Sequence, residues 1–221
     1  MHTLDLDALN RDFELADPKS ILRWSVETFR ERLAIVTSFQ PSGIVTLHML
    51  EQLGARPDVL TVDTGLLFPE TYALMDAVTR RFDLRLKRIT PRIEPPAPNT
   101  EPPWAVDPDA CCHHRKVLPL QEALTPYSAW VAGLRRDQKG RAETPMLTVK
   151  HGRIKIHPFA NWTESMLWTY LHAHELPYNA LHDYGYPSIG CWPCTRAVRQ
   201  GEDARDGRWA DSNKNECGIH F

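Results

Sequence analysis

The chain has 221 residues, between one and two typical domains of about 150 residues, which favours one large domain with an appended tail. It contains 26 Lys and Arg against 28 Asp and Glu, so no strong positive field attracts nucleic acid or an anionic membrane. Hydrophobic residues make up 42%, as in globular proteins, and no apolar run approaches the length of a membrane span. The acidic, charge-interrupted N-terminus does not resemble a secretory signal, so we expect a cytoplasmic protein without nucleic-acid or membrane partners.

The first half of the chain alternates between helix and strand patterns. Apolar residues at helical spacing alternate with short β-branched runs, which are typical of buried strands. The predicted elements are helix 18–33, strand 34–39, helix 44–53, strand 58–65, helix 69–82 and strand 84–89. This alternation predicts an α/β fold with a doubly wound, mostly parallel sheet.

The second half is less regular. Residues 91–108 are rich in proline and are predicted to hold no regular structure, as a functional lid or a plain connector. The elements predicted after it are helix 111–124, strand 128–134, a β-hairpin over 146–158 that turns at 151–152, and helix 163–176. Regular structure thins after residue 175. We therefore expect one domain over residues 1–206 and a C-terminal tail over residues 207–221.

In doubly wound sheets, ligands bind outside the carboxyl ends of the strands. The serine loop, residues 37–43, joins the first strand to a helix and offers Ser38, Ser42 and Gly43. Hydroxyls and free N–H groups at such a turn suit phosphate or sulfate, although serine and glycine are also common at turns without a ligand. After the second strand, Asp63-Thr64-Gly65 either binds a ribose or base amine or simply forms a turn.

The third candidate is the basic loop, residues 133–141. It carries four cations, Arg135, Arg136, Lys139 and Arg141, directly after a buried strand. Guanidinium groups match the oxygens of phosphate or sulfate, so the loop is a candidate anion clamp. A solvated charged face is the alternative.

Four of the five cysteines occur as pairs. Cys111 and Cys112 are adjacent, and Cys191 and Cys194 form a C-x-x-C. Because a cytosolic disulfide framework is unexpected, two thiolate pairs indicate zinc or an iron–sulfur cluster, and His113 and His114 could complete a zinc site. Cys217 stands apart in the polar tail, either as a reactive thiol activated by nearby cations or as a bystander.

Several of these segments together resemble the motifs of one family. They are 62–72, 111–120, 130–142, 190–198, and Gly-Arg-Trp at 207–209 followed by Glu-Cys-Gly-Ile-His at 216–220. In this order they resemble the assimilatory adenylyl-sulfate reductases, the thioredoxin-dependent group of the phosphoadenylyl-sulfate reductase family. The resemblance covers residues 34–220. It implies an adenine-nucleotide alpha-hydrolase-like, Rossmann-like fold with a flexible C-terminal tail.

The resemblance also implies roles for individual residues. Cys111, Cys112, Cys191 and Cys194 would ligate a 4Fe-4S cluster, and Lys116 would lie between this cluster and the substrate. Cys217 matches the catalytic nucleophile, and His220, in the same motif, is also expected to be catalytic. Substrate-binding positions are expected at Ser38, Ser42, Gly43, Asp63, Thr64, Gly65, Arg135, Arg136 and Arg141. The serine loop keeps only the first serine of the S-x-G-x-D-S pattern that relatives of this fold often have.

The activity implied is reduction of adenosine 5′-phosphosulfate to sulfite and AMP in sulfate assimilation and cysteine biosynthesis. Cys217 would carry an S-sulfocysteine, and thioredoxin or a glutaredoxin-like dithiol would release sulfite from a homo-oligomeric enzyme. A reductase of 3′-phosphoadenylyl sulfate, or of both nucleotides, is the first alternative. Enzymes restricted to that substrate typically lack the paired cysteines. The second alternative is a zinc-stabilised nucleotide-binding module without catalysis.

Overall fold

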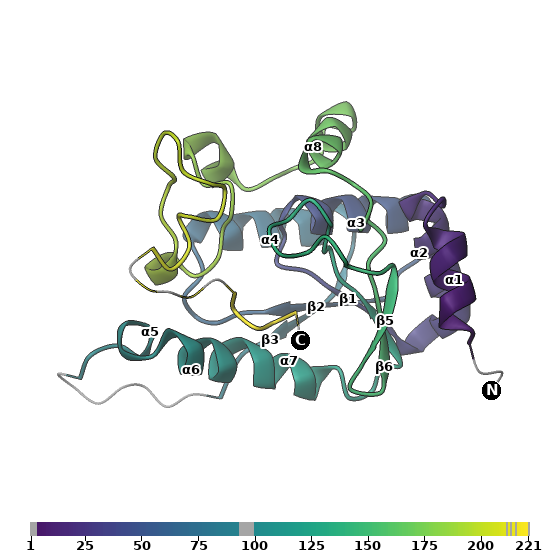
Figure 1. The fold of residues 1–221 in the computed structure, drawn as a ribbon, viewed down its shortest axis with the longest axis horizontal. Helices are drawn as coiled ribbons and strands as arrows, with labels where there is room; N and C mark the ends of the chain where they lie inside the picture. The colour runs from purple at the N-terminus through teal and green to yellow at the C-terminus, as the bar shows by residue number, and fades with distance from the viewer. Residues whose placement is uncertain (1–3, 93–99, 211, 213, 215, 221) are drawn as a thin grey trace. The chain divides into compact units, whose positions relative to one another are not determined.

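A computed structural model describes residues 4–92, 100–210, 212, 214 and 216–220 (Figure 1). The chain divides into two compact units. Unit 1 comprises residues 1–60, 77–87 and 124–178, and unit 2 comprises residues 61–76, 88–123 and 179–221. The predicted boundary between a domain and a tail at residue 207 stays a prediction.

The described residues form one six-stranded sheet in the order β3-β2-β1-β4-β6-β5. Their bounds are β1 Leu33–Val36, β2 Asp58–Val62, β3 Arg85–Ile89, β4 Ala129–Val131, β5 Leu147–Lys150 and β6 Arg153–Ile156. Strand β1 runs parallel to β2 and β4, β4 runs parallel to β6, and β5 is the antiparallel edge. The mostly parallel, doubly wound sheet confirms the predicted fold class, and its connections diverge at β1, where such folds bind ligands.

The helices of unit 1 bury one face each. They are α1 Leu6–Phe13, α2 Pro18–Phe29, α3 Pro41–Gln52 and α8 Glu164–Ala173, with a 3-10 turn η1 at Arg30–Arg32, while α4, Pro69–Arg81, runs from unit 2 into unit 1. Asp17 caps α2 by accepting from Ser20 N, and Pro18 occupies a first-turn position, where its missing N–H does no harm. Helix α3 packs against α2 and α8 (Figure 1).

Unit 1 differs from the prediction at the ends of two elements and by one additional helix near the N-terminus. Helix 18–33 ends at Phe29 because Arg30 has a positive φ of 48°, which no α-helix continues. The strand expected over 34–39 ends at Val36, so more of this segment belongs to the serine loop. Helix α1 is an element that the sequence analysis does not predict.

Unit 2 is built around short helices. Its elements are α5 Pro103–Val106, α6 Pro108–Cys112, the π-helix η2 His113–Val117, α7 Leu118–Ala123 and the 3-10 turns η3 Ala180–Tyr184 and η4 Trp192–Cys194. The helix predicted over 111–124 is therefore continued through a π-helical turn. The prediction of no regular structure over 91–108 is wrong at α5, where Pro102 and Pro103 occupy the N-terminus. Residues 93–99 of that segment lie outside the described residues.

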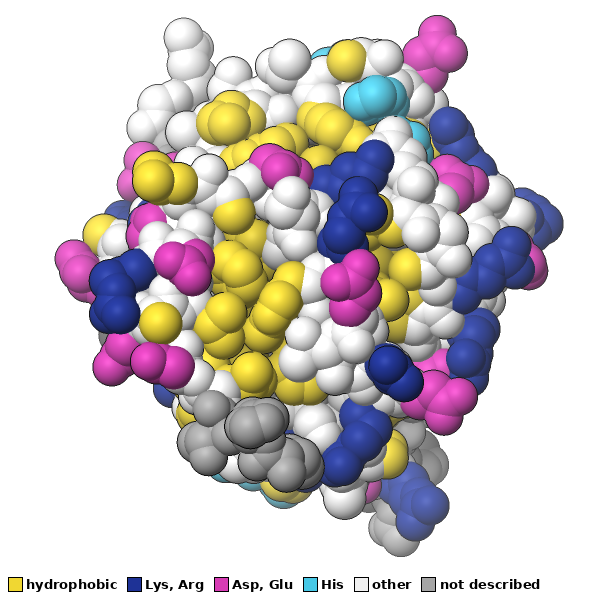
Figure 2. Space-filling model, turned by 90° about the vertical axis from the view of Figure 1, so that its right-hand side faces the viewer, with side chains coloured by type: hydrophobic (Ala, Val, Ile, Leu, Met, Phe, Trp, Pro, Cys, Tyr) yellow, Lys and Arg dark blue, Asp and Glu magenta, His cyan; other side chains and the backbone are white. Residues whose placement is uncertain are grey.

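Figure 2 shows one face of the molecule, on which acidic and basic side chains are interspersed and hydrophobic side chains gather near the middle of the view. This mixture agrees with a formal net charge of −2. Within the described residues, no helix is both long enough and apolar enough to span a membrane.

Candidate active site

In unit 1, the serine loop follows β1 and leads into α3. Its first hydroxyl organises it locally, because Thr37 Oγ1 accepts from Phe39 N at 2.9 Å. Gly43 is required at the start of α3, since a Cβ there would overlap the Thr37 hydroxyl. Ser38 is exposed and Ser42 is partly exposed. The loop thus presents hydroxyls at the carboxyl end of β1, as predicted.

The basic loop lies beside the serine loop within unit 1. A Cβ on Gly133 would overlap Ser42 Oγ, so the two segments touch at this glycine. Arg135 is only 7% exposed, and its Nε donates to Asp137 Oδ1 at 2.9 Å. Arg136 is held by Glu14 instead, and Arg141 is partly exposed. Both leading arginines therefore have carboxylate partners, and substrate contact by the three arginines stays a prediction.

In unit 2, Asp63 is the centre of a polar cluster at the end of β2. Its Oδ1 accepts from Tyr72 OH at 2.7 Å and from Gly65 N at 3.0 Å, and Arg88 Nη2 donates to Oδ2 at 2.6 Å. Burial opposes ionisation, but these hydrogen bonds outweigh it and lower the pKa of Asp63. Burial and the Asp63 carboxylate raise the pKa of Tyr72 to about 12. Asp63 is thus a fixed anion.

Thr64 connects this cluster to the C-x-x-C. Its Oγ1 lies 3.3 Å from Cys191 Sγ, and its carbonyl accepts from Arg115 Nη1 at 3.0 Å. The next residues continue the contact, because Leu67 bridges to Cys191 and Trp192 N donates to Leu66 O at 2.8 Å. The Asp-Thr-Gly segment is therefore fixed both to the C-x-x-C and, through Arg115, to the helix that carries the other cysteine pair.

The paired cysteines are sheltered from water. Cys112 and Cys191 are each 5% exposed, while Cys111 and Cys194 are partly exposed. Burial raises the pKa of Cys112 to about 11 and also raises the pKa values of Cys111 and Cys194. Metal binding to these sulfurs would therefore release protons.

Two cations are buried among these thiols. Lys116, in the π-helical turn, is 9% exposed. Burial favours its neutral amine, but electrostatic interactions with the sulfurs of Cys191, Cys217 and Cys112 outweigh this and raise the pKa of Lys116. Arg208 is also 9% exposed, and burial lowers its pKa while Cys217 acts in the opposite sense. A guanidinium nevertheless keeps its proton in proteins, so both groups are cations.

The residues around Arg208 form a space that its guanidinium group fills. Its Cζ lies 4.4 Å from the centre of the Trp209 ring, and Nη1 donates to Ser188 Oγ at 3.3 Å. Gly190 leaves the space that the guanidinium fills, since a Cβ there would lie 2.5 Å from Arg208 Cζ. Arg208 Nε is buried and has no hydrogen-bond partner among the residues that the structure describes. A cation with an unused donor beside thiols is suited to an anionic ligand.

The tail brings Cys217 to the same region of unit 2. Gly218, which follows Cys217, has a positive φ of 73°, a conformation that glycine adopts without strain. A Cβ on Gly218 would lie 3.3 Å from Val117 Cγ2, so the tail packs on the π-helical turn next to Lys116. The structure therefore brings Cys217 together with Lys116, Arg208 and the paired cysteines. His220 is partly exposed, and no catalytic contact is assigned to it.

The donor set of the four paired cysteines fits an iron–sulfur cluster. All four belong to unit 2, and soft sulfur ligands are what such clusters require. Among the residues that the structure describes, no group of three or more His, Cys, Asp or Glu side chains is arranged around a single metal ion. A cubane cluster takes one thiolate at each iron, so its ligands need not converge on one point.

Comparison with known proteins assigns the family. Residues 32–197 match the phosphoadenosine phosphosulfate reductase domain. The adenosine 5′-phosphosulfate reductase of Salinibacter ruber is 46% identical, over 97% of this chain and 88% of its own length. The chain belongs to the phosphoadenosine phosphosulfate reductase family. This confirms the resemblance seen in the sequence and makes the protein an oxidoreductase of sulfate assimilation.

Further similar proteins are named for the 3′-phosphorylated substrate. The phosphoadenosine 5′-phosphosulfate reductase of Gloeobacter violaceus is 41% identical over 97% of this chain and 93% of its own length. The phosphoadenylyl-sulfate reductase of Candida auris, solved as a phosphate complex, has a TM-score of 0.79 at 29% identity and covers 90% of this chain and 99% of that chain. Family membership alone therefore leaves both nucleotides open as substrates.

Arg208 is the residue that sequence reasoning missed. The Gly-Arg-Trp motif contributes to the family resemblance, but the sequence analysis predicts no site role for its arginine. The signal available was its position between the C-x-x-C and Cys217. Only the folded unit shows that Arg208 is buried beside thiols, and this burial is what makes it a candidate for binding an anion.

We expect Tyr72→Phe to lower the free energy of unfolding by about 1.5 to 3 kcal/mol near neutral pH, the range for a hydrogen bond to a charged group. The folded pKa of Asp63 lies below its unfolded value of about 3.9. The stabilisation is therefore present above that value and is lost as the pH falls through the lowered folded pKa. Urea unfolding at neutral and acidic pH measures both parts.

Tyr184→Phe is the matched control, because Tyr184 is 73% exposed and belongs to the same unit. Its free energy of unfolding should equal that of the wild type. A Tyr72→Phe effect that is the same at neutral pH and at about pH 2 would contradict the account of Asp63 as a hydrogen-bonded anion.

Proposed function

We propose that this family member reduces adenosine 5′-phosphosulfate to sulfite and AMP, with Cys217 as the nucleophile and thioredoxin or a similar dithiol as the reductant. The observation that carries the proposal is the packing of the tail on the π-helical turn. Through it, the Cys217 thiol lies in the electrostatic field of the buried Lys116 and Arg208. Cations at such a position can hold a sulfonate and stabilise the negative charge that develops during its transfer.

The first step is a displacement at sulfur. The Cys217 thiolate attacks the sulfur of the phosphosulfate, a sulfur–cysteine bond forms, and the bond from sulfur to the phosphate oxygen breaks. AMP leaves with the electron pair of that bond, and Cys217 becomes S-sulfocysteine. Negative charge develops on the departing phosphate oxygen and remains on the sulfonate. Lys116 and Arg208 are cations of unit 2 that can stabilise it, because burial shields them from water.

The second step requires an external dithiol. One of its thiolates attacks the Cys217 sulfur, sulfite leaves with the bonding electron pair, and a mixed disulfide forms. The second thiol of the reductant then displaces Cys217 as a thiolate. The dithiol is oxidised to a disulfide while the sulfur of the substrate is reduced from sulfate to sulfite. Thioredoxin and glutaredoxin-like proteins supply this chemistry.

Cys111, Cys112, Cys191 and Cys194 would hold a 4Fe-4S cluster in unit 2. Such a group, when bound, supplies structural cross-linking and a fixed charge distribution beside the nucleophile. The protein residues around the sulfurs support this assignment, because Thr64 Oγ1 contacts Cys191 Sγ and Lys116 offers a positive charge to several thiolates. The same paired cysteines favour the substrate without a 3′-phosphate. We further propose a homo-oligomeric enzyme of the cytoplasm.

The direct test is sulfite release from each nucleotide with thioredoxin present. We expect faster turnover of adenosine 5′-phosphosulfate than of its 3′-phosphorylated form, and no sulfite from Cys217→Ser with either. Without thioredoxin, the wild type incubated with substrate should gain one sulfonate on Cys217, detected by peptide mass spectrometry.

Wild type without nucleotide is the control for the mass shift, and iron content shows that Cys217→Ser is intact. A sulfonate found on Cys191 or Cys194 would overturn the assignment of the nucleophile. Preferred turnover of the 3′-phosphorylated nucleotide would favour the first alternative function.

We expect Cys194→Ser to lose the cluster, because its thiolate is one of four ligands and ligand loss couples to local folding. Iron analysis and absorbance near 400 nm of anaerobically purified protein measure the loss, and Cys217→Ser is the matched cysteine control that should keep full iron. A colourless wild type containing zinc instead of iron would support the zinc-stabilised module. Full iron in Cys194→Ser would contradict the ligand set.

We expect Lys116→Ala to lower kcat/KM by about a hundredfold or more, the scale of losing one aimed charge in a shielded site. Iron content must be measured on the same samples, so that a loss of rate is separated from a loss of cluster. Lys150→Ala, at an exposed position of β5, is the control and should leave the rate unchanged. Wild-type kinetics in a fully loaded Lys116→Ala enzyme would remove Lys116 from the catalytic residues.

A further inference from the structure

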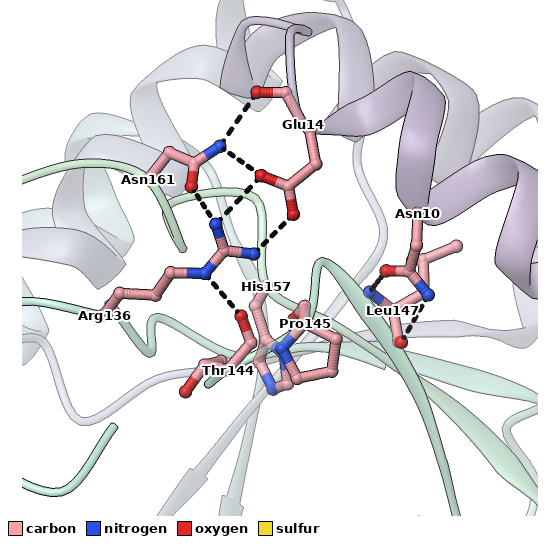
Figure 3. A network of polar contacts seen from close by, with 8 residues as sticks. All are labelled: Asn10, Glu14, Arg136, Thr144, Pro145, Leu147, His157 and Asn161. Carbon is pink, nitrogen blue, oxygen red and sulfur yellow. Dashed lines mark hydrogen bonds and ion pairs between the residues drawn. The ribbon is translucent and has the colours of Figure 1, made fainter. Parts of the chain in front are cut away.

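Helix α1 is attached to the rest of unit 1 by two polar anchors (Figure 3). The first is Asn10, whose Nδ2 donates to Leu147 O at 3.0 Å and whose Oδ1 accepts from Leu147 N at 2.8 Å. The side-chain amide thus takes the place of a neighbouring strand at the edge strand β5. This anchor fixes the position of the last turn of α1.

The second anchor is the guanidinium of Arg136, in the basic loop (Figure 3). Its Nη2 donates to Glu14 Oε1 at 2.6 Å, its Nη1 donates to Glu14 Oε2 at 2.9 Å and to Asn161 Oδ1, and its Nε donates to Thr144 O at 2.8 Å. Four of the five N–H groups are therefore engaged within the protein. The pair with Glu14 is bidentate, the most directional arrangement available to a guanidinium.

Asn161 closes the network. Its Nδ2 donates to the main-chain carbonyl of Glu14 at 2.9 Å and to Glu14 Oε2 at 3.2 Å. Asn161 precedes Thr163, the N-cap of α8, and Glu14 directly follows α1. One guanidinium therefore joins the end of α1, the approach to α8 and the basic loop.

The joined loop carries groups predicted to bind the substrate. Arg135 precedes Arg136 directly, and Gly133 packs against Ser42 of the serine loop. A shift of Arg136 would therefore move Arg135 and change the packing at Ser42. The main chain is tied at the same point, because Arg136 N donates to Ala160 O at 2.9 Å. The network is thus placed to set the geometry of both loops.

We propose that Glu14 and Arg136 are positioning residues, which hold the basic loop in the conformation that binds the adenylyl nucleotide, and that Arg136 itself is not a ligand of the substrate. This inference rests on the proposed function for the identity of the nucleotide. It assigns to α1, an element distant in sequence from every motif of the site, a function in substrate affinity.

Loss of a positioning contact changes affinity more than chemistry, because neither Glu14 nor Arg136 takes part in the proposed chemical steps. We expect Glu14→Ala to raise the KM for adenosine 5′-phosphosulfate and the Kd for AMP by about tenfold, with kcat within about twofold of the wild type. Arg136→Ala should have the same effect, and the double variant should be no worse than Arg136→Ala, since both remove one shared contact. Glu14→Gln, which keeps one acceptor, should be intermediate.

Glu27→Ala is the matched control, because Glu27 is an exposed acid on the neighbouring α2. All assays are run well below each variant's thermal midpoint, so that every sample is folded. Calorimetry with AMP and steady-state sulfite release are measured on the same preparations. The control should reproduce wild-type KM and Kd.

Three outcomes would overturn the proposal. A lower thermal midpoint of Glu14→Ala with unchanged KM and Kd would make the network purely structural. A loss in Arg136→Ala that greatly exceeds the loss in Glu14→Ala would make Arg136 a substrate ligand. If the wild type does not bind AMP, the premise that the basic loop binds an adenylyl nucleotide is wrong, and the proposed function is wrong with it. A wild type that binds AMP but releases no sulfite would refute the proposed function alone, and the AMP affinities would still test Glu14 and Arg136.

Discussion

Two buried cations beside thiols are the constraint on which the candidate active site depends. Lys116 and Arg208 are each 9% exposed, and the described residues give neither of them a carboxylate partner. A buried charge is costly unless an opposite charge lies close to it. The groups near these two cations that can carry the opposite charge are the cysteine sulfurs, together with any anion that the site binds. The cysteines around the two cations therefore stabilise the folded unit as well as providing chemical groups for the site.

The local structure of unit 2 follows from accommodating these groups. Glycine at position 190 leaves room for the guanidinium of Arg208, and Trp209 covers that group with its ring. The helix after the adjacent cysteines passes through a π-helical turn, a form that is rare and often occurs at functional sites. Gly218 then allows the tail to pack on this turn through a positive φ. Each feature departs from regular structure, and each brings sulfur and positive charge together.

The sequence predicted the parts of the structure that depend on short-range patterns. Alternation of helices and strands predicted the sheet class, because that pattern is a local property. The spacing of the cysteines predicted a candidate ligand set, which stays a prediction. The π-helical turn and α5 were not predictable, since proline-rich and helical composition alone do not fix them. Arg208 was missed for a different reason. Its role as a cation of the site depends on its burial. That burial depends on residues distant in sequence, such as Gly190, which lies 18 positions before it.

The pair of arginines at 135 and 136 shows why charge patterns are ambiguous in a sequence. As neighbours after a buried strand, both fit an anion clamp equally well. In the folded unit they differ, because Arg135 pairs with Asp137, two residues away, and with Glu164 at 3.6 Å, whereas Arg136 is engaged by Glu14, 122 residues away. A partner so distant leaves no local signal, and the helix that carries it was itself not predicted. A cation that already has four internal hydrogen bonds gains little from a ligand, so geometry rather than charge decides which arginine can bind one.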